Sequence, residues 1–283
     1  MRFLFGFVAM FVLCTSGHAQ APAKLALVIA NGDYDGESGL DGSEAAHVRA
    51  AERRYVGDLP NALMDGQLVA DALRGAGYEV EIFRNADRAM MAGAVMRFYA
   101  QAEMAGPSAQ TIIYYAGHAI QVGGANYLIG TRARLPEIPA TLTGDDLTRM
   151  ALGLGMPLTE MLVRARPPQA PGFNLVLIDA CRDNPWEELL PGGPGRERGF
   201  VVVHVSTPRT VVAFSSGPGQ MAEDGEYVNG PYASALARRL RQPGAPIDRM
   251  LEGVMGEVAA MTSAQQIPWV RGRLNDNTCV SGC

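Results

Sequence analysis

A thiol and an imidazole each follow an apolar run in this chain, and together these two groups can carry out nucleophilic catalysis. Cys181 ends the segment LVLIDAC, and His118 ends the segment TIIYYAGH. Runs of this kind are typical of buried strands, and residues just past the carboxyl end of a parallel strand lie where active sites collect. If the two strands are neighbours, the imidazole can serve as general acid and base toward a thiolate nucleophile.

The segments that must position these residues alternate between strand and helix. The patterns predict strands at 24–30, 78–83, 111–115, 173–178 and 210–214, and a hairpin around Gly123 and Gly124. They predict helices from Asn61 to about Gly75, from the cap residue Asp87 to about Met104, and at 157–166, 232–241 and 247–261. This order is typical of an α/β fold with a mostly parallel central sheet covered on both faces.

Three further segments look like additions to this core. Residues 36–59 are polar and glycine-rich and indicate an inserted surface segment, with a short helix expected at 43–54. Residues 186–209, rich in Gly, Pro and Arg, indicate a linker loop, and residues 271–283 a C-terminal tail.

Composition and motifs exclude several classes of protein. With 19% charged residues and a formal net charge of −5, the chain is neither a basic nucleic-acid binder nor a disordered tail. It contains no HExxH, GxSxG or P-loop pattern, so a zinc or serine hydrolase has no support. The segment NGDYDG starts like a calcium loop at Asn31, but Gly42 stands where the loop needs its Glu ligand.

The first residues have the layout of a secretory signal peptide. One positive charge precedes an apolar core from Phe3 to Leu13, and small residues lead to Ala19. The alternative is an uncleaved anchor, but the core is shorter than the ~20 residues that a spanning helix needs. We therefore expect residues 1–19 to be removed and the protein to be exported, periplasmic or secreted, without stable membrane insertion.

Removal of the signal would leave three cysteines. Cys279 and Cys283 stand in the tail NTCVSGC, close enough to bridge in an oxidising compartment. If they pair, Cys181 is the one remaining thiol, and it is then either a buried structural residue or a functional one.

The segments YYAGHA and IDACRDNP together resemble the caspase-like cysteine peptidases, especially the metacaspase-type members of bacteria. Ala180, Cys181 and Arg182 match the caspase signature Q-A-C-[RQG]-G. The resemblance extends over roughly residues 24–270 and includes ALVIANGDY, LPNALMDGQLVADALRGAGYEV and SSGPGQMAEDG. It implies a caspase-like three-layer α/β/α sandwich.

The resemblance also implies a Cys–His dyad that hydrolyses peptide bonds. Cys181 would be the nucleophile and His118 the general acid and base. The oxyanion of the tetrahedral intermediate would be held by the N–H groups of Ala119 and Cys181. Ala119 stands where the family usually has Gly, and Ala116 where metacaspases often have a hydroxyl residue.

Metacaspases have an acidic pocket for the residue before the cut, which implies cleavage after Arg or Lys. The matching acids are Asp65 and Asp179. The two-residue period of a strand independently puts Asp179 on the same face as Cys181. Two carboxylates facing a planar guanidinium favour Arg and reject acidic side chains.

No cofactor or metal is expected, although some metacaspases need calcium. Asp145 and Asp146 are the acids that such a site would use, but Arg132 stands nearby where the family usually has an Asp-containing turn.

The expected linker contains Arg196 and Arg198, where an Arg-specific enzyme would cut itself; the alternative is a plain solvated loop. Two other interpretations use the same residues. One is a catalytically weak or inactive module that binds peptides or partner proteins in the cell envelope, and the other is a thiol acyl-transfer enzyme.

Overall fold

The computed structural model describes residues 21–34, 57–133, 143–165, 167–181, 203–217, 228–274 and 276–283. Its eight-stranded sheet has the order β2-β1-β3-β6-β7-β8, and β4 and β5 extend it from β3 as an antiparallel arm. The strands are β1 (Lys24–Ala30), β2 (Glu79–Arg84), β3 (Gln110–Val122), β4 (Ala125–Ile129), β5 (Gly155–Pro157), β6 (Phe173–Cys181), β7 (Thr210–Phe214) and β8 (Trp269–Arg271).

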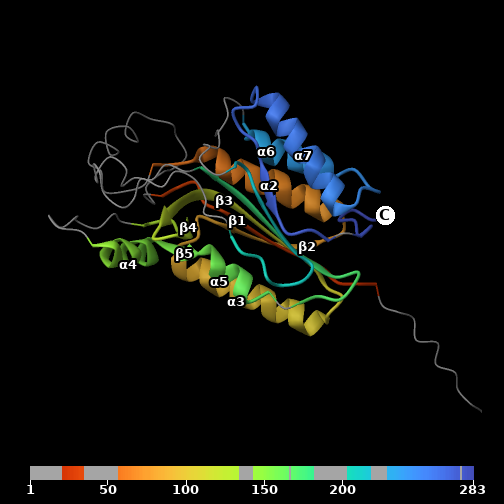
Figure 1. The fold of residues 1–283 in the computed structure, drawn as a ribbon, viewed down its shortest axis with the longest axis horizontal. Helices are drawn as coiled ribbons and strands as arrows, with labels where there is room; N and C mark the ends of the chain where they lie inside the picture. Colours follow the sequence, from red (N-terminus) through yellow and green to blue (C-terminus); the bar gives the residue numbers. More distant parts are fainter. Residues whose placement is uncertain are drawn as a thin grey trace, which may run out of the picture.

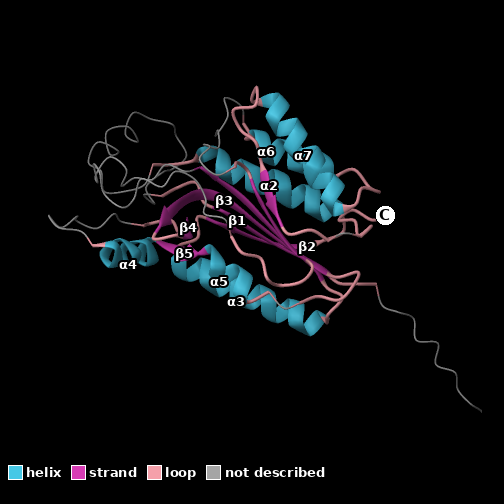
Figure 2. Cartoon of the chain, viewed as in Figure 1, coloured by secondary structure: helices cyan, strands magenta, loops and turns pink. Residues whose placement is uncertain are grey.

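Helices cover both faces of the sheet and give three layers (Figure 1). One face carries α2 (Pro60–Gly75), α6 (Pro231–Leu240) and α7 (Ile247–Met261), and the other carries α3 (Arg88–Ala105) and α5 (Leu158–Val163). The remaining described helix, α4 (Gly144–Leu154), lies beside the antiparallel arm of β4 and β5, as Figure 2 also shows. No helix among the described residues is long and apolar enough to cross a membrane.

Burial on both faces explains why the central strands are almost continuous apolar runs. β1, β3, β6 and β7 pair in parallel, and only the short β8 joins this row antiparallel. Their side chains alternate between two core clusters, one beneath each helical layer. A parallel sheet buried in this way requires apolar side chains pointing in both directions. The predicted α/β sandwich with a mostly parallel sheet is confirmed.

Most element boundaries lie close to those predicted, but β3 is much longer. The prediction that this strand ends near Tyr115 is wrong, because β3 continues through His118 to Val122. Its pairing with β1 stops at Ala116, and from Ala119 onward it pairs with β4 instead. The chain can stay extended because it exchanges one partner for another. Gly123 and Gly124, both with positive φ, make the two-residue turn of the expected hairpin.

Three elements were not predicted, namely α4, β5 and β8. The strands are only three residues long, too short for a periodic pattern to stand out. α4 did have a signal: Thr143 and Asp146 form a capping box, in which each side chain accepts from the other residue's backbone N–H. The helix predicted at 43–54 lies outside the described residues.

A buried asparagine ties together three loops at the carboxyl end of β1. Asn31 is 0% exposed, and its amide nitrogen donates to the carbonyl oxygens of Ala86 (3.0 Å) and Ile129 (3.1 Å). Its amide oxygen accepts from the N–H of Ala86 at 2.8 Å. One side chain therefore links backbone groups after β2 and at the end of β4, and it supplies the acceptor for the buried N–H of Ala86.

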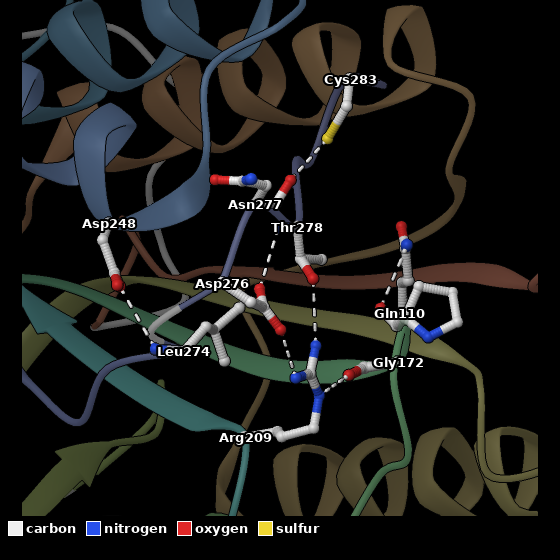
Figure 3. A network of polar contacts seen from close by, with 10 residues as sticks. Gln110, Gly172, Arg209, Asp248, Leu274, Asp276, Asn277, Thr278 and Cys283 are labelled. Carbon is white, nitrogen blue, oxygen red and sulfur yellow. Dashed lines mark hydrogen bonds and ion pairs between the residues drawn. The ribbon is translucent and has the colours of Figure 1, made fainter.

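Polar contacts join the C-terminal residues to the starts of the central strands (Figure 3). The Arg209 guanidinium donates to the carbonyl oxygen of Gly172 (2.6 Å), pairs with Asp276 (2.5 Å) and reaches the Thr278 hydroxyl (3.1 Å). The Lys24 ammonium donates to the carbonyl oxygen of Val280 at 2.9 Å. The tail is thus held at the N-terminal ends of the strands, far from the edge that carries His118.

We predict that Asn31→Ala lowers the free energy of unfolding by about 2–4 kcal/mol, because it removes the buried hydrogen bonds to Ala86 and Ile129 and leaves the N–H of Ala86 without its acceptor. For a domain of this size, thermal denaturation should show a melting temperature about 5–10 °C lower. Asn277→Ala, at an exposed position, is the matched control and should melt like the wild type. An unchanged melting temperature for Asn31→Ala would contradict the role assigned to this side chain.

Candidate active site

The pairing of β3 with β6 places the predicted histidine beside the predicted cysteine. The two strands run parallel, and their register sets Tyr114 against Leu177, Ala116 against Asp179 and His118 against Cys181. Adjacent strands lie about 4.8 Å apart, so these two backbones are direct neighbours at the carboxyl edge of the sheet. The condition that the two strands be neighbours is therefore met.

The register also decides which face of the sheet carries the site. Tyr114, Ala116 and Leu177 belong to the core cluster beneath α2 and α6. Because successive strand residues alternate between faces, Asp179 follows Leu177 on this same face. The site thus opens on the side of the sheet covered by α2 and α6.

The imidazole of His118 is buried and its orientation is determined by a backbone carbonyl. The residue is 3% exposed, and its Nε2 lies 2.7 Å from the carbonyl oxygen of Gly57. A carbonyl oxygen can only accept a hydrogen bond, so Nε2 must carry the proton. In the neutral ring Nδ1 then has the lone pair, and it is the nitrogen that can act as a base.

Two tyrosines hold the histidine from its other sides. The Tyr34 hydroxyl accepts from the backbone N–H of His118 at 2.7 Å, and the two rings pack with their centroids 4.8 Å apart. The Tyr115 hydroxyl lies 2.6 Å from the carbonyl oxygen of His118. These contacts fix both the backbone and the ring of the histidine.

Only glycine fits between the two tyrosine hydroxyls at position 117. Gly117 has φ +153°, and a Cβ there would lie 2.6 Å from the Tyr34 hydroxyl and 2.7 Å from that of Tyr115. Both hydroxyls are also partners of His118, so a side chain at position 117 would displace the contacts that orient the histidine.

The partner of the imidazole comes from the end of the expected inserted segment. The Asp58 carboxylate accepts from the N–H of Tyr34 at 2.8 Å, and the N–H of Leu59 donates to the carbonyl oxygen of Gly32 at 2.8 Å. The residues just after β1 therefore meet residues 57–59 beside His118, which brings the carbonyl of Gly57 to the ring. Sequence reasoning missed Gly57, because any residue type could supply a carbonyl.

The two alanines that depart from the resemblance lie on opposite faces of the sheet. Ala119 is buried, and its methyl group packs with Leu128 in the cluster on the α3 side, away from the face that carries Asp179. Ala116 is buried on the α2 side. Ala119 therefore does not narrow the site.

Asp65 is brought to this edge by the close packing of α2 on β1. A Cβ on Gly66 would lie 2.5 Å from that of Ala30, so the two elements touch where Asp65 lies. Asp65 is only 5% exposed. Its Oδ1 accepts from the side-chain nitrogen of Asn229 (2.9 Å) and from the backbone N–H of Gly230 (3.0 Å).

Asp179 is half-buried and is held by a different group. Its Oδ2 accepts from the hydroxyl of Tyr114 at 2.8 Å. Burial, followed by the charges of Asp179 and Asp65, raises the pKa of Tyr114 well above its usual range, so the phenol stays protonated and can donate. Burial and then the charge of Asp179 also raise the pKa of Tyr232 at the start of α6.

Asp179 contacts Tyr114 directly, and the charge of Asp65 also acts on this buried tyrosine. Sequence reasoning missed Tyr114, Asn229 and Tyr232. The two-residue period of β3 was a usable signal for Tyr114, since it precedes Ala116 and His118 on the same strand face. No local pattern marks Asn229 or Tyr232, which reach this edge only through the packing of α6.

The sequence also singled out cysteines for a disulfide, acids for a calcium site and arginines for self-cleavage. Cys279 and Cys283 form a disulfide in the C-terminal tail, with their Cα atoms 5.4 Å apart. Asp146 accepts from the N–H and the hydroxyl of Thr143 and pairs with Arg149 at 2.6 Å. Among the described residues, no three His, Cys, Asp or Glu side chains cluster as metal ligands would. Arg196 and Arg198 lie outside the described residues.

The chain matches the model of a known protein family. The family model described as a caspase domain matches residues 23–278, which includes nearly all of the described chain. No curated protein matches this chain.

We predict that neutral His118 is the tautomer with its proton on Nε2, because Gly57 offers only an acceptor. Nitrogen-15 NMR of the imidazole rings near pH 8 measures this directly. His204, whose side chain is exposed, is the internal control and should show an average of both tautomers. A proton on Nδ1 of neutral His118 would contradict the assignment of that nitrogen as the base.

Proposed function

The chain belongs to the caspase-domain family, and on that premise we propose that it is a cysteine endopeptidase that cuts after Arg or Lys through Cys181 and His118. Family membership supports a cysteine-peptidase-like function. The observation that carries the dyad is the register of β3 and β6, in which His118 and Cys181 are direct partners. The Nε2 contact with Gly57 adds to it, since it leaves Nδ1 as the base.

In the proposed reaction, Nδ1 of His118 takes the proton of the Cys181 thiol, and the thiolate attacks the carbonyl carbon of the scissile bond. The N–H groups of Ala119 and Cys181 stabilise the oxyanion that forms. His118 then returns its proton to the leaving amine, and the carbon–nitrogen bond breaks to give an acyl-enzyme. Water, deprotonated by His118, hydrolyses the thioester and restores the thiol.

Preference for a basic residue before the cut is supported by the two carboxylates. Asp65 and Asp179 lie close enough to Tyr114 for both charges to act on its hydroxyl. Two negative groups at one edge attract a guanidinium or ammonium group and repel an acidic side chain. This preference would set the chain apart from peptidases that cut after Asp.

We also propose that the protein acts outside the cytoplasm. The supporting observations are the signal-like residues 1–19 and the disulfide of Cys279 with Cys283, a bond that persists in oxidising compartments. Its substrates would then be peptides or proteins of the periplasm or the surroundings.

We expect the mature protein to release a fluorophore from peptides that end in Arg, and to leave peptides that end in Asp intact. Cys181→Ala should lower kcat/KM by about 10³-fold or more, because it removes the nucleophile. The matched control is the double variant Cys279→Ser and Cys283→Ser, whose cysteines lie at the opposite edge of the sheet and whose loss should leave turnover almost unchanged.

The assay is run with and without reductant and with and without calcium, so that neither requirement hides activity. Turnover of the Asp peptide alone would overturn the proposed specificity. Absence of any Cys181-dependent turnover would favour a caspase-like module that binds peptides without cutting them.

A second prediction concerns the linker, where Arg196 and Arg198 would be sites of self-cleavage. After incubation, the intact mass of the wild type should show two fragments that separate after one of these arginines, while Cys181→Ala stays whole. A variant with both arginines changed to Gln should also stay whole and keep its activity on peptides. Identical unclipped masses for wild type and Cys181→Ala would rule out self-processing.

A further inference from the structure

A cavity lies at the opposite end of the central strands from His118 and Cys181. Its volume is about 240 Å³. On the sheet side it is lined by Thr111 and Asn174, the second residues of β3 and β6. Thr111 precedes His118 by seven residues on β3, which corresponds to about 20 Å along a strand. The cavity is therefore separate from the candidate active site.

The sheet presents a row of buried polar side chains at this end. Thr111, Asn174 and Thr210 stand opposite one another in the register of β3, β6 and β7, and each is at most 4% exposed. Thr111 Oγ1 donates to Asn174 Oδ1 (2.7 Å), and Asn174 Nδ2 donates to Thr210 Oγ1 (3.1 Å). Further along the same strand faces, Ile113 and Val176 belong to the apolar cluster on the α3 side. A covered parallel sheet is normally apolar throughout, so the polar row distinguishes the part of the sheet that lines the cavity.

Tyr99 lines the same cavity from α3 and brings a hydroxyl group without a hydrogen-bond partner. The residue is only 9% exposed, and its hydroxyl oxygen is buried. Burial raises the pKa of Tyr99, so the phenol stays protonated and can donate. A buried hydroxyl that makes no hydrogen bond lowers the stability of the fold, and its presence calls for an explanation. A ligand that accepts from it would provide one.

The wall of the cavity opposite the sheet is firmly built. The cavity is bordered by Pro107 and Pro168, whose rings restrict the backbone. The N–H of Gln169 donates to the carbonyl oxygen of Pro107 at 2.8 Å and ties the two proline-containing segments together. A Cβ on Gly172 would lie 2.7 Å from that same carbonyl oxygen, so the segments are also in close contact. The cavity is therefore formed before any ligand enters.

Arg164, at the end of α5, supplies a positive charge to the lining. Its guanidinium pairs with Glu160 at 3.5 Å, and both side chains are partly exposed. An exposed ion pair of this kind contributes little to stability, so the guanidinium can turn to a ligand at small cost. A guanidinium and a carboxylate match in charge and in geometry.

We propose that this cavity is a second binding site, which takes a small carboxylic acid with an apolar body and holds its carboxylate by Arg164 and the hydroxyl of Tyr99. Ala102 and the prolines contact the apolar body. The volume equals that of about eight molecules of liquid water, which limits the ligand to the size of a single ring with a short acidic side chain. The inference goes beyond the proposed peptidase function and does not depend on it, because binding is measured without turnover.

Calorimetric titration with phenylacetate tests the site, and phenethylamine, which has the same ring with a positive charge, is the matched comparison. Phenylacetate should bind with a Kd on the order of 1 mM or lower, as expected for so small a ligand. It should also raise the melting temperature as its concentration increases, because it binds only the folded protein. Phenethylamine should show neither effect.

Substitutions assign the two contacts. Arg164→Gln should raise the Kd for phenylacetate about tenfold, because a charged hydrogen bond is lost. Arg149→Gln, an exposed arginine of α4 that also pairs with an acid of its own helix, is the matched control and should bind like the wild type. Tyr99→Phe should raise the Kd about 3- to 10-fold without lowering the melting temperature, since the hydroxyl has no internal hydrogen bond to lose.

Filling the cavity tests its location. Ala102→Leu keeps a strong helix former on α3 and places a larger side chain at the cavity, so it should abolish phenylacetate binding. If this variant melts at a lower temperature, the comparison of Arg164→Gln with Arg149→Gln decides instead.

Three results would overturn the inference. The first is the absence of heat and of any change in melting temperature with phenylacetate at about 10 mM. The second is equal or tighter binding of phenethylamine, which would mean that Glu103, the acid in the lining, sets the charge preference. The third is wild-type affinity for phenylacetate in Arg164→Gln or in a stable Ala102→Leu.

Discussion

Parallel pairing between β3 and β6 carries His118 and Cys181 to the same edge of the sheet and makes them direct neighbours. Strands of this kind are held by regular backbone hydrogen bonds, and a shift of one residue would turn every side chain to the other face. Close packing on both faces of β3 and β6 opposes such a shift, since each side chain would then have to fit the core cluster on the other face. The position of the dyad is therefore a consequence of how the core is packed.

Next to this pairing, β3 changes its partner strand from β1 to β4. At the point of change, other residues of the chain can contact His118. Past Ala116 the strand leaves β1, and two described stretches lie beside it, residues 31–34 after β1 and residues 57–59. The ring of Tyr34 comes from the first and the carbonyl of Gly57 from the second. The general base is thus oriented by a segment whose own sequence contains no catalytic motif, and the backbone carbonyl selects the tautomer.

The positions of Asp65 and Asp179 also depend on packing between elements that are far apart in the chain. Close contact between Gly66 and Ala30 sets the depth of α2, and this depth places Asp65 beside the first turn of α6. Asp179 is oriented by Tyr114, whose burial keeps the phenol protonated. The two carboxylates therefore share one edge, but each is held through a different element.

The fold class and the family of this chain could be predicted from its sequence. The alternation of apolar runs and helical periods predicted the sandwich, and the segments around His118 and Cys181 indicated the family, because short-range patterns report burial and motif chemistry. Only the tertiary structure decided the long extension of β3, the Gly57 partner of the imidazole, and the contacts of Asp65 with Asn229 and Gly230. These are contacts between backbone or amide groups far apart in the chain. Almost any residue type can make them, so no local pattern predicts them, and the packing of the helices on the sheet alone selects them.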